Sequence, residues 1–270
     1  MTAELAPPPA HLWLPLLQRL TEVAPGWLVW KNADAALAGH GDIDSAAPRR
    51  EWDAIENEFR EWARASSLGP VIVCRHIPKM LDLVALADEA ETFMELDLNC
   101  GKVFRGSVLF HPEQLLPLSV VDPRGFRRLR PGAEGLLLLV FNGMDRAGRI
   151  RAHELKRRHI PDLMRQDPQG MRSAAQLFGP AHGAVLRAGE RLLEDRWDRR
   201  ALLEVEGWSL ARAITEPDAA LGRAWFRLVT KRQCPVLRAV FGGRRLTSDR
   251  RSWLASVART HLVYETRVRG

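Results

Sequence analysis

The feature that most constrains the fold is a change in sequence texture near Pro131. Before it, short runs of apolar and β-branched residues alternate with Gly and Pro breaks, which is typical of strands joined by turns. Beyond it, β-branched residues become rarer, and long Arg, Glu, Leu and Ala stretches show helical spacing. We therefore predict a mixed α/β (α+β) fold, in which residues 1–130 form a mixed β-sheet with flanking helices and residues 131–270 form an all-α C-terminal domain.

Individual elements follow from the same periodicities. The spacing of Trp52, Ile55, Phe59 and Trp62 puts four large apolar side chains on one face of a helix over 50–65. A shorter helix is predicted over 11–20. The expected strands cover 27–31, 42–46, 71–74, 80–86 and 92–98, with a polar loop over 32–41. The expected C-terminal helices cover 134–142, 153–165, 183–195, 199–214, 219–231 and 249–266.

Composition excludes several classes of protein. The chain is 46% hydrophobic and 27% charged, which is ordinary for a globular protein of 270 residues. Its longest strongly apolar run, 135–141, is far shorter than the roughly 20 residues of a membrane span. No basic-then-apolar leader precedes the Pro-rich start, so we expect a cytoplasmic protein with no membrane partner. The P-loop, dinucleotide-binding and α/β-hydrolase motifs are missing from the sequence.

Charge is distributed unevenly along the chain. Residues 1–144 contain 14 Lys and Arg against 19 Asp and Glu, whereas residues 145–270 contain 26 against 14. A basic second half suggests an anionic partner such as a nucleotide or a nucleic acid. A solvated Arg-rich helical surface explains the same asymmetry equally well.

Three acidic residues form the candidate site. Asp42 and Asp44 are one residue apart in a predicted strand, so both carboxylates project from the same face while Ile43 points to the other. Their mutual repulsion is costly unless a cation lies between them, and hard oxygen ligands suit Mg²⁺. Asp97 lies on the polar face of a later strand. Together the three carboxylates can hold two divalent ions about 4 Å apart, as in metal-dependent phosphate chemistry.

These residues also carry a family resemblance. Trp30-Lys31-Asn32, nine further residues, Asp42-Ile43-Asp44, a helix, strands and then Glu95-Leu96-Asp97-Leu98 resemble the nucleotidyltransferases of the DNA polymerase β superfamily, in particular its small bacterial members. The resemblance covers roughly residues 12–110, and more loosely the helical tail. It implies a nucleotidyltransferase α/β domain that binds Mg²⁺ and a nucleoside triphosphate such as ATP, and passes a nucleoside monophosphate to an acceptor hydroxyl.

The resemblance assigns roles to individual residues. Asp42, Asp44 and Asp97 would be metal ligands, and Asp97 would also be the base for the acceptor. Lys31 and Asn32 stand where the family has a Gly-Ser turn, so Lys31 is expected to contact the triphosphate.

Two further cations are candidates for binding phosphate or acceptor groups. Arg105 lies in a Gly-flanked turn over 101–106, where the alternative is a hairpin turn whose charges face water. Lys156 lies on a basic helix in the region from which related folds send a cation to the triphosphate. A solvated basic face is its equally good alternative.

Three functions remain open on the sequence. The first is a nucleotidyltransferase with a small-molecule acceptor, and the second is a catalytically silent scaffold that binds a nucleotide or a protein. The third is transfer to an RNA end, which ranks below the first because no stacking aromatics accompany the scattered basic residues. The enzyme hypothesis predicts that the three Asp carboxylates converge within a few ångströms, that all three are partly exposed in a cleft facing the helical half, and that at least one crowded acid has a raised pKa.

Overall fold

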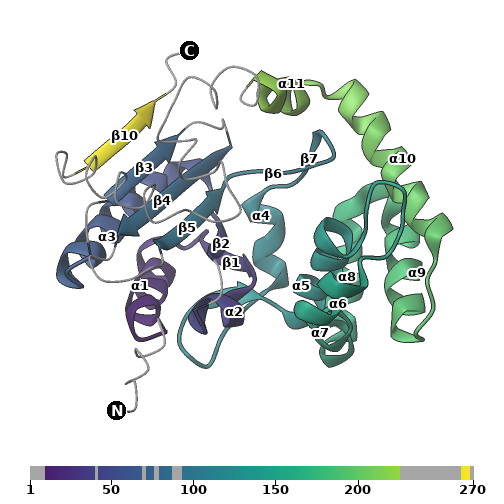
Figure 1. The fold of residues 1–270 in the computed structure, drawn as a ribbon, viewed down its shortest axis with the longest axis horizontal. Coiled ribbons are helices and arrows are strands. Elements are labelled where there is room, and N and C mark those ends of the chain that lie inside the picture. The colour runs from purple at the N-terminus through teal and green to yellow at the C-terminus, as the bar shows by residue number, and fades with distance from the viewer. Residues whose placement is uncertain are drawn as a thin grey trace, which may run out of the picture. The chain divides into compact units, whose positions relative to one another are not determined.

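The computed structural model describes residues 10–39, 42–68, 71–75, 79–86, 93–225 and 263–267. Figure 1 shows helices and a mixed sheet, so the predicted mixed α/β class is confirmed. The chain divides into two compact units. Unit 1 contains residues 1–100, 121–127 and 222–270, and unit 2 contains residues 101–120 and 128–221. No helix among the described residues has the length and apolar character needed to cross a bilayer.

Unit 1 is built on a mixed sheet whose strands run in the order β10-β3-β4-β5-β2-β1. Strands β2 and β5 are parallel, as are β10 and β3, whereas β1 with β2, β3 with β4, and β4 with β5 are antiparallel. The bounds are β1 Leu28–Lys31, β2 Ile43–Ala46, β3 Val71–Arg75, β4 Met80–Leu86, β5 Phe93–Asn99 and β10 Val263–Arg267. Two of the sequence boundaries between the units fall inside short strands: one in β8 (Ser119–Val121) and one in β9 (Arg127–Leu129).

The core of unit 1 lies between this sheet and helices α1 (Ala10–Val23) and α3 (Trp52–Ala65). The four predicted apolar residues of α3 are buried, as are Leu16 and Leu20 of α1. From the sheet, Ile43, Leu96 and Leu98 enter the same cluster. Because side chains alternate along a strand, burying these residues directs their neighbours Asp44 and Asp97 to the opposite face.

Two predictions about unit 1 and the C-terminus are wrong. The expected loop over 32–41 contains the short helix α2 (Ala33–Leu37), because its alanines favour helix and Ala33, Ala36 and Leu37 are buried in the core. Within the expected helix over 249–266, the described residues from Val263 onward form strand β10, which pairs in parallel with β3. Their β-branched and aromatic side chains favour a strand, so the second half is not all-α. Residues 249–262 lie outside the described residues.

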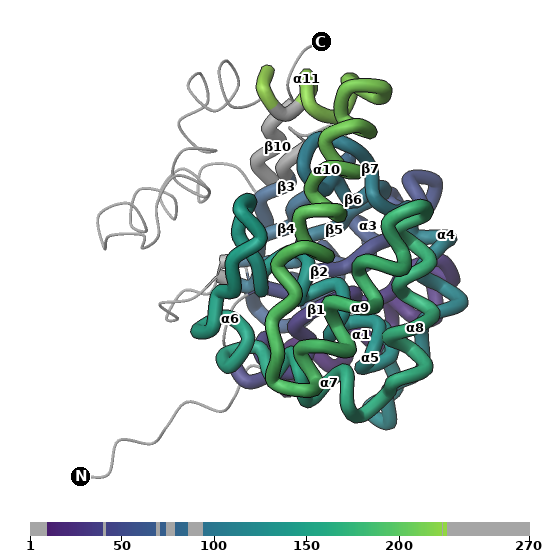
Figure 2. The backbone as a smooth tube through the Cα atoms, turned by 90° about the vertical axis from the view of Figure 1, so that its right-hand side faces the viewer, coloured from purple at the N-terminus to yellow at the C-terminus, as the bar shows by residue number. Residues whose placement is uncertain are grey.

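Unit 2 is mainly helical. Its hairpin consists of β6 (Lys102–Phe104) and β7 (Ser107–Phe110). The helices are α4 Pro112–Leu115, α5 Pro131–Leu138, α6 Ala152–Arg157, α7 Ile160–Gln166, α8 Pro168–Ala175, α9 His182–Leu193 and α10 Arg199–Thr215. A π-helical turn, Leu139–Gly143, follows α5. Figure 2 shows α9 and α10 side by side. Helix α11 (Asp218–Trp225) begins in unit 2 and ends in unit 1.

The predicted helix over 153–165 is two helices. His159 has a left-handed backbone with φ of 50°, and Pro161 follows within the first turn of α7. Proline lacks an N–H and its ring would clash with the carbonyl four residues earlier, that of Arg157 at the end of α6, so one continuous helix cannot run through position 161.

Asp167 fixes the packing of α5 against α8. Its carboxylate accepts two hydrogen bonds from Arg130, at 3.0 and 2.6 Å, and caps α8 by accepting from the backbone N–H of Gly170 at 2.9 Å. Gly132 lies so close that a Cβ there would stand 1.8 Å from the carbonyl oxygen of Asp167. The two helices can therefore approach this closely only with glycine at position 132.

We predict that Gly132→Ala lowers the free energy of unfolding by about 1–3 kcal/mol, as overpacking does elsewhere. The matched control is Gly207→Ala in α10, where a Cβ would meet nothing within 4 Å. Alanine there should raise stability by up to about 1 kcal/mol through helix propensity. Urea unfolding followed by circular dichroism measures both, and equal effects of the two substitutions would contradict the assigned role of Gly132.

Candidate functional site

A row of charged side chains crosses four strands of unit 1. Asp44 of β2 is the register partner of Asp97 on β5, and Asp97 is the partner of Asp82 on β4. On the other side of β2, Asp44 is the partner of Lys31 on β1. Register partners on neighbouring strands lie about 5 Å apart, so the pairing alone brings these groups together.

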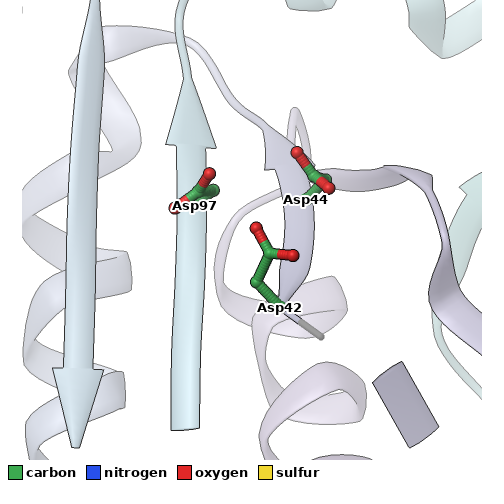
Figure 3. Close-up of side chains that lie close together, drawn as sticks. All are labelled: Asp42, Asp44 and Asp97. Carbon is green, nitrogen blue, oxygen red and sulfur yellow. The ribbon is translucent and has the colours of Figure 1, made fainter. Parts of the chain in front are cut away.

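Asp42 completes the predicted acidic trio. It precedes β2 directly and points from the same side as Asp44, while Asp97 extends from the neighbouring strand (Figure 3). One carboxylate oxygen from each of Asp42, Asp44 and Asp97 lies within 4.8 Å of the others, which is close enough for a shared metal ion. The predicted convergence of the three carboxylates is therefore seen.

The predicted exposure is wrong for one of them. Asp42 and Asp97 are half-buried, but Asp44 is only 2% exposed. Two side chains contact its Oδ2 atom: the Lys31 ammonium at 2.7 Å and the Asn32 amide, which donates from Nδ2 at 3.4 Å. Burial of a carboxylate is costly without such partners. In this structure Lys31 and Asn32 therefore stabilise the buried Asp44 carboxylate.

Asn32 holds an unusual backbone conformation. Its φ is 60°, in the left-handed region, at the junction between β1 and α2. Asparagine tolerates this conformation better than most residues. The position thus joins a strand to a helix in a single residue and leaves the Asn32 amide within reach of Asp44.

Polar contacts also tie β2 to β5 next to the acids. The Ser45 hydroxyl donates to the backbone carbonyl of Asp97 at 2.9 Å, and the Asn99 amide donates to the carbonyl of Ser45 at 3.4 Å. Both side chains are buried. Ser45 therefore links the two strands that present the acids.

Sequence reasoning missed two further acids. Asp82, which is fully buried, and Glu95 form a second close group with Asp97, again with oxygens within 4.8 Å. The alternation along β5 already placed Glu95 on the face of Asp97. Asp82 lies within the otherwise apolar run of β4. An acid is unusual in such a run, so this position could have been recognised from the sequence.

Crowding changes the acidity of Glu95. Its burial, followed by the charges of Asp97, Asp42 and Asp44, raises its pKa from 4.5 to about 9. Glu95 is therefore protonated at neutral pH in the metal-free protein. A raised pKa was expected on at least one of Asp42, Asp44 and Asp97, and the structure gives one to their neighbour Glu95.

The other two predicted cations belong to unit 2. Arg105 has φ of 52° in the two-residue turn of the β6–β7 hairpin, and its Nε donates to Glu206 of α10 at 2.8 Å. Lys156 lines a cavity of about 550 Å³ together with His159, Leu155 and Trp197. Arg105 thus ties the hairpin to α10, and neither cation belongs to the unit that holds the acids.

The carboxylates of the unit 1 cluster lie close enough together to hold a metal ion. All its ligand candidates are carboxylates, which suit Mg²⁺, Mn²⁺ or Ca²⁺ better than softer metals. Comparison of the chain with protein-family models, curated proteins and solved structures gives no match.

We predict that the raised pKa of Glu95 makes the metal-free protein less stable as the pH rises. A carboxyl whose folded pKa lies above its unfolded value stabilises the fold fully below about pH 4.5 and loses that contribution as the pH rises through about 9. Between these limits the slope approaches about 1.4 kcal/mol per pH unit. Glu95→Gln should remove this slope and be more stable than wild type at pH 8.

The measurement is chemical unfolding in EDTA at pH 5 to 9. Glu61→Gln, which alters an exposed glutamate on α3, is the matched control and should follow the wild-type profile. Parallel profiles for Glu95→Gln and wild type would show that Glu95 is ionised in the folded protein.

Proposed function

We propose that this chain is a Mg²⁺-dependent nucleotidyltransferase that moves a nucleoside monophosphate from a nucleoside triphosphate to an acceptor hydroxyl. The observation that carries the proposal is the convergence of Asp42, Asp44 and Asp97 from two parallel neighbouring strands, with oxygens within 4.8 Å of one another. It is supported by the resemblance of the Asp42-Ile43-Asp44 and Glu95-Leu96-Asp97-Leu98 segments to the DNA polymerase β superfamily. In this proposal the mixed sheet of unit 1 is the nucleotidyltransferase core.

Each residue has a distinct part in the proposed reaction. Asp42, Asp44 and Asp97 hold the metal ions, which when bound neutralise phosphate charge and activate the attacking oxygen. Asp97 additionally accepts the proton of the acceptor hydroxyl, a role that the family resemblance assigns to it; its side chain is half-buried. Lys31 and Asn32 face the triphosphate at the start of α2. Ser45 keeps Asp97 in register with Asp44.

The acceptor we propose is a small molecule. An RNA end is the weaker choice, because among the described residues many basic side chains of the second half already pair with acids: Arg157, Arg158, Arg165, Arg187, Arg191 and Arg212.

A catalytically silent scaffold is the second candidate. The observation in its favour is the Lys31 ion pair, because an ammonium 2.7 Å from Asp44 already neutralises part of the site. The two candidates differ in what Mg²⁺ does. A functional trio should give metal-dependent thermal stabilisation by a nucleoside triphosphate, since ligand binding stabilises the folded state by mass action. A scaffold should show none.

We predict that Asp97→Asn, and separately the double variant Asp42→Ala with Asp44→Ala, lower Mg²⁺-dependent pyrophosphate release at least about a thousandfold. Such a loss is the scale expected when transition-state charge stabilisation is removed. Asp97→Asn should stay folded, because it removes repulsion between crowded carboxylates. The double variant removes the same kind of repulsion but also leaves the Lys31 ammonium without Asp44, so its folding is measured by circular dichroism before the assay. The assay follows pyrophosphate with each of the four ribonucleoside triphosphates and a panel of hydroxyl acceptors.

Asp53→Asn is the matched control, because Asp53 is an exposed acid in the first turn of α3 in the same unit. It should keep wild-type activity. Full activity in the Asp97→Asn variant would refute the proposed function.

A further inference from the structure

Lys31 reaches the acids because β1 contains a bulge. Leu28 pairs with Ala46 and Val29 with Ser45, but Lys31 pairs with Asp44, so Trp30 is one extra residue in β1. In an unbroken strand Lys31 would oppose Ile43 and share its core face. The bulge instead places the Lys31 side chain on the face of Asp44. Bulges often re-aim a side chain next to an active site.

The resulting ion pair is held in a sheltered position. The Lys31 ammonium lies 2.7 Å from Asp44 Oδ2, and the two side chains are 15% and 3% exposed. The same ammonium lies 5.1 Å from the centroid of the Trp30 ring, within cation–π range. Trp30 is itself buried. The inserted residue thus both re-aims Lys31 and supports its charge.

Lys31 and a metal ion compete for the same carboxylate. A divalent ion bound to Asp44 would lie within a few ångströms of the ammonium, and like charges at such a distance repel. A lysine has a long flexible side chain with a compact charge, so the ammonium can move to another anion without a backbone change. The anion that arrives with the metal in the proposed reaction is a polyphosphate.

We propose that Lys31 is an internal counter-ion that occupies Asp44 in the metal-free site and transfers to phosphate oxygens when metal and polyphosphate bind together. The site is thereby selective for the metal–triphosphate complex over the free metal ion. This inference rests on the proposed function, since it assigns the regulation of the same site. The alternative is that Lys31 and Asp44 form a fixed structural ion pair, which would stay in place when metal and polyphosphate bind.

Removal of the Lys31 charge should change two affinities in opposite directions, that for the free metal ion and that for the metal–triphosphate complex. As a counter-ion, Lys31 opposes the free metal and assists the metal–triphosphate complex. Lys31→Met should therefore bind Mg²⁺ or Mn²⁺ alone at least on the order of tenfold more tightly, because the repulsion between an ammonium and a divalent ion about 4–5 Å apart reaches that factor even at the dielectric constant of water. The same variant should bind Mg²⁺ with inorganic triphosphate on the order of tenfold more weakly than wild type.

The experiment is calorimetric titration of the full chain after EDTA treatment and removal of the chelator. The probes are Mn²⁺ alone, Mg²⁺ alone and Mg²⁺ with inorganic triphosphate, which needs no knowledge of the nucleobase. Lys31→Gln is a second variant that removes the charge but can still donate to Asp44, and it should behave as Lys31→Met does. Lys31→Arg keeps the charge and should resemble wild type. Lys79→Met removes a lysine charge elsewhere in unit 1 and should change neither affinity by more than about twofold.

Three outcomes would overturn the inference: unchanged affinity for the metal alone in both uncharged variants, weaker binding of the metal alone as well as of Mg²⁺ with triphosphate, or equal effects of Lys79→Met. Asp97→Asn distinguishes this failure from failure of the proposed function. If Asp97→Asn abolishes metal binding while the Lys31 variants leave it unchanged, the metal site stands and only the counter-ion role is wrong. If Asp97→Asn leaves metal binding unchanged, the proposed function fails as well.

Discussion

The rest of the site depends on the register between β2 and β5. Burial of Ile43, Leu96 and Leu98 against α1 and α3 fixes that register, because a slip of one residue would move every apolar side chain out of the core and every acid into it. The apolar face thus provides the free energy that holds Asp44 and Asp97 side by side against their repulsion. A carboxylate pair that is unfavourable by itself is positioned by apolar side chains on the opposite face of the sheet.

The core faces of the strands and of α3, and the side of the sheet that carries Asp44 and Asp97, could be predicted from the sequence because they depend on local periodicity. A period of two identified Ile43 and Leu96 as core residues and Asp44 and Asp97 as their opposites, and helical spacing identified the buried face of α3. The pairing of Asp97 with Asp82 could not be predicted in this way. It depends on which strand neighbours β5 and in what register, and local alternation contains neither fact.

The bulge in β1 and the strand β10 were missed for related reasons. Nothing in Leu28–Lys31 marks Trp30 as an extra residue, since the bulge exists only relative to β2. Strand β10 forms by pairing with β3, which is distant in the sequence. Such pairing overrides the helical spacing that predicted a helix over 249–266. Similarly, Arg105 was recognised as a turn residue, but its partner Glu206 lies about a hundred positions away.

Two neutralising devices limit the charge of the metal-free acid cluster. Protonation of Glu95, whose pKa is raised to about 9, removes one negative charge, and the ammonium of Lys31 adds one positive charge beside Asp44. They differ in what they respond to. The proton on Glu95 follows pH and the summed charge of its neighbours, whereas Lys31 contacts one carboxylate directly and, in the role proposed for it, would be displaced there by a cation. Both devices lower the electrostatic cost of holding the carboxylates together without a metal, and Lys31 does so at a carboxylate of the proposed metal trio.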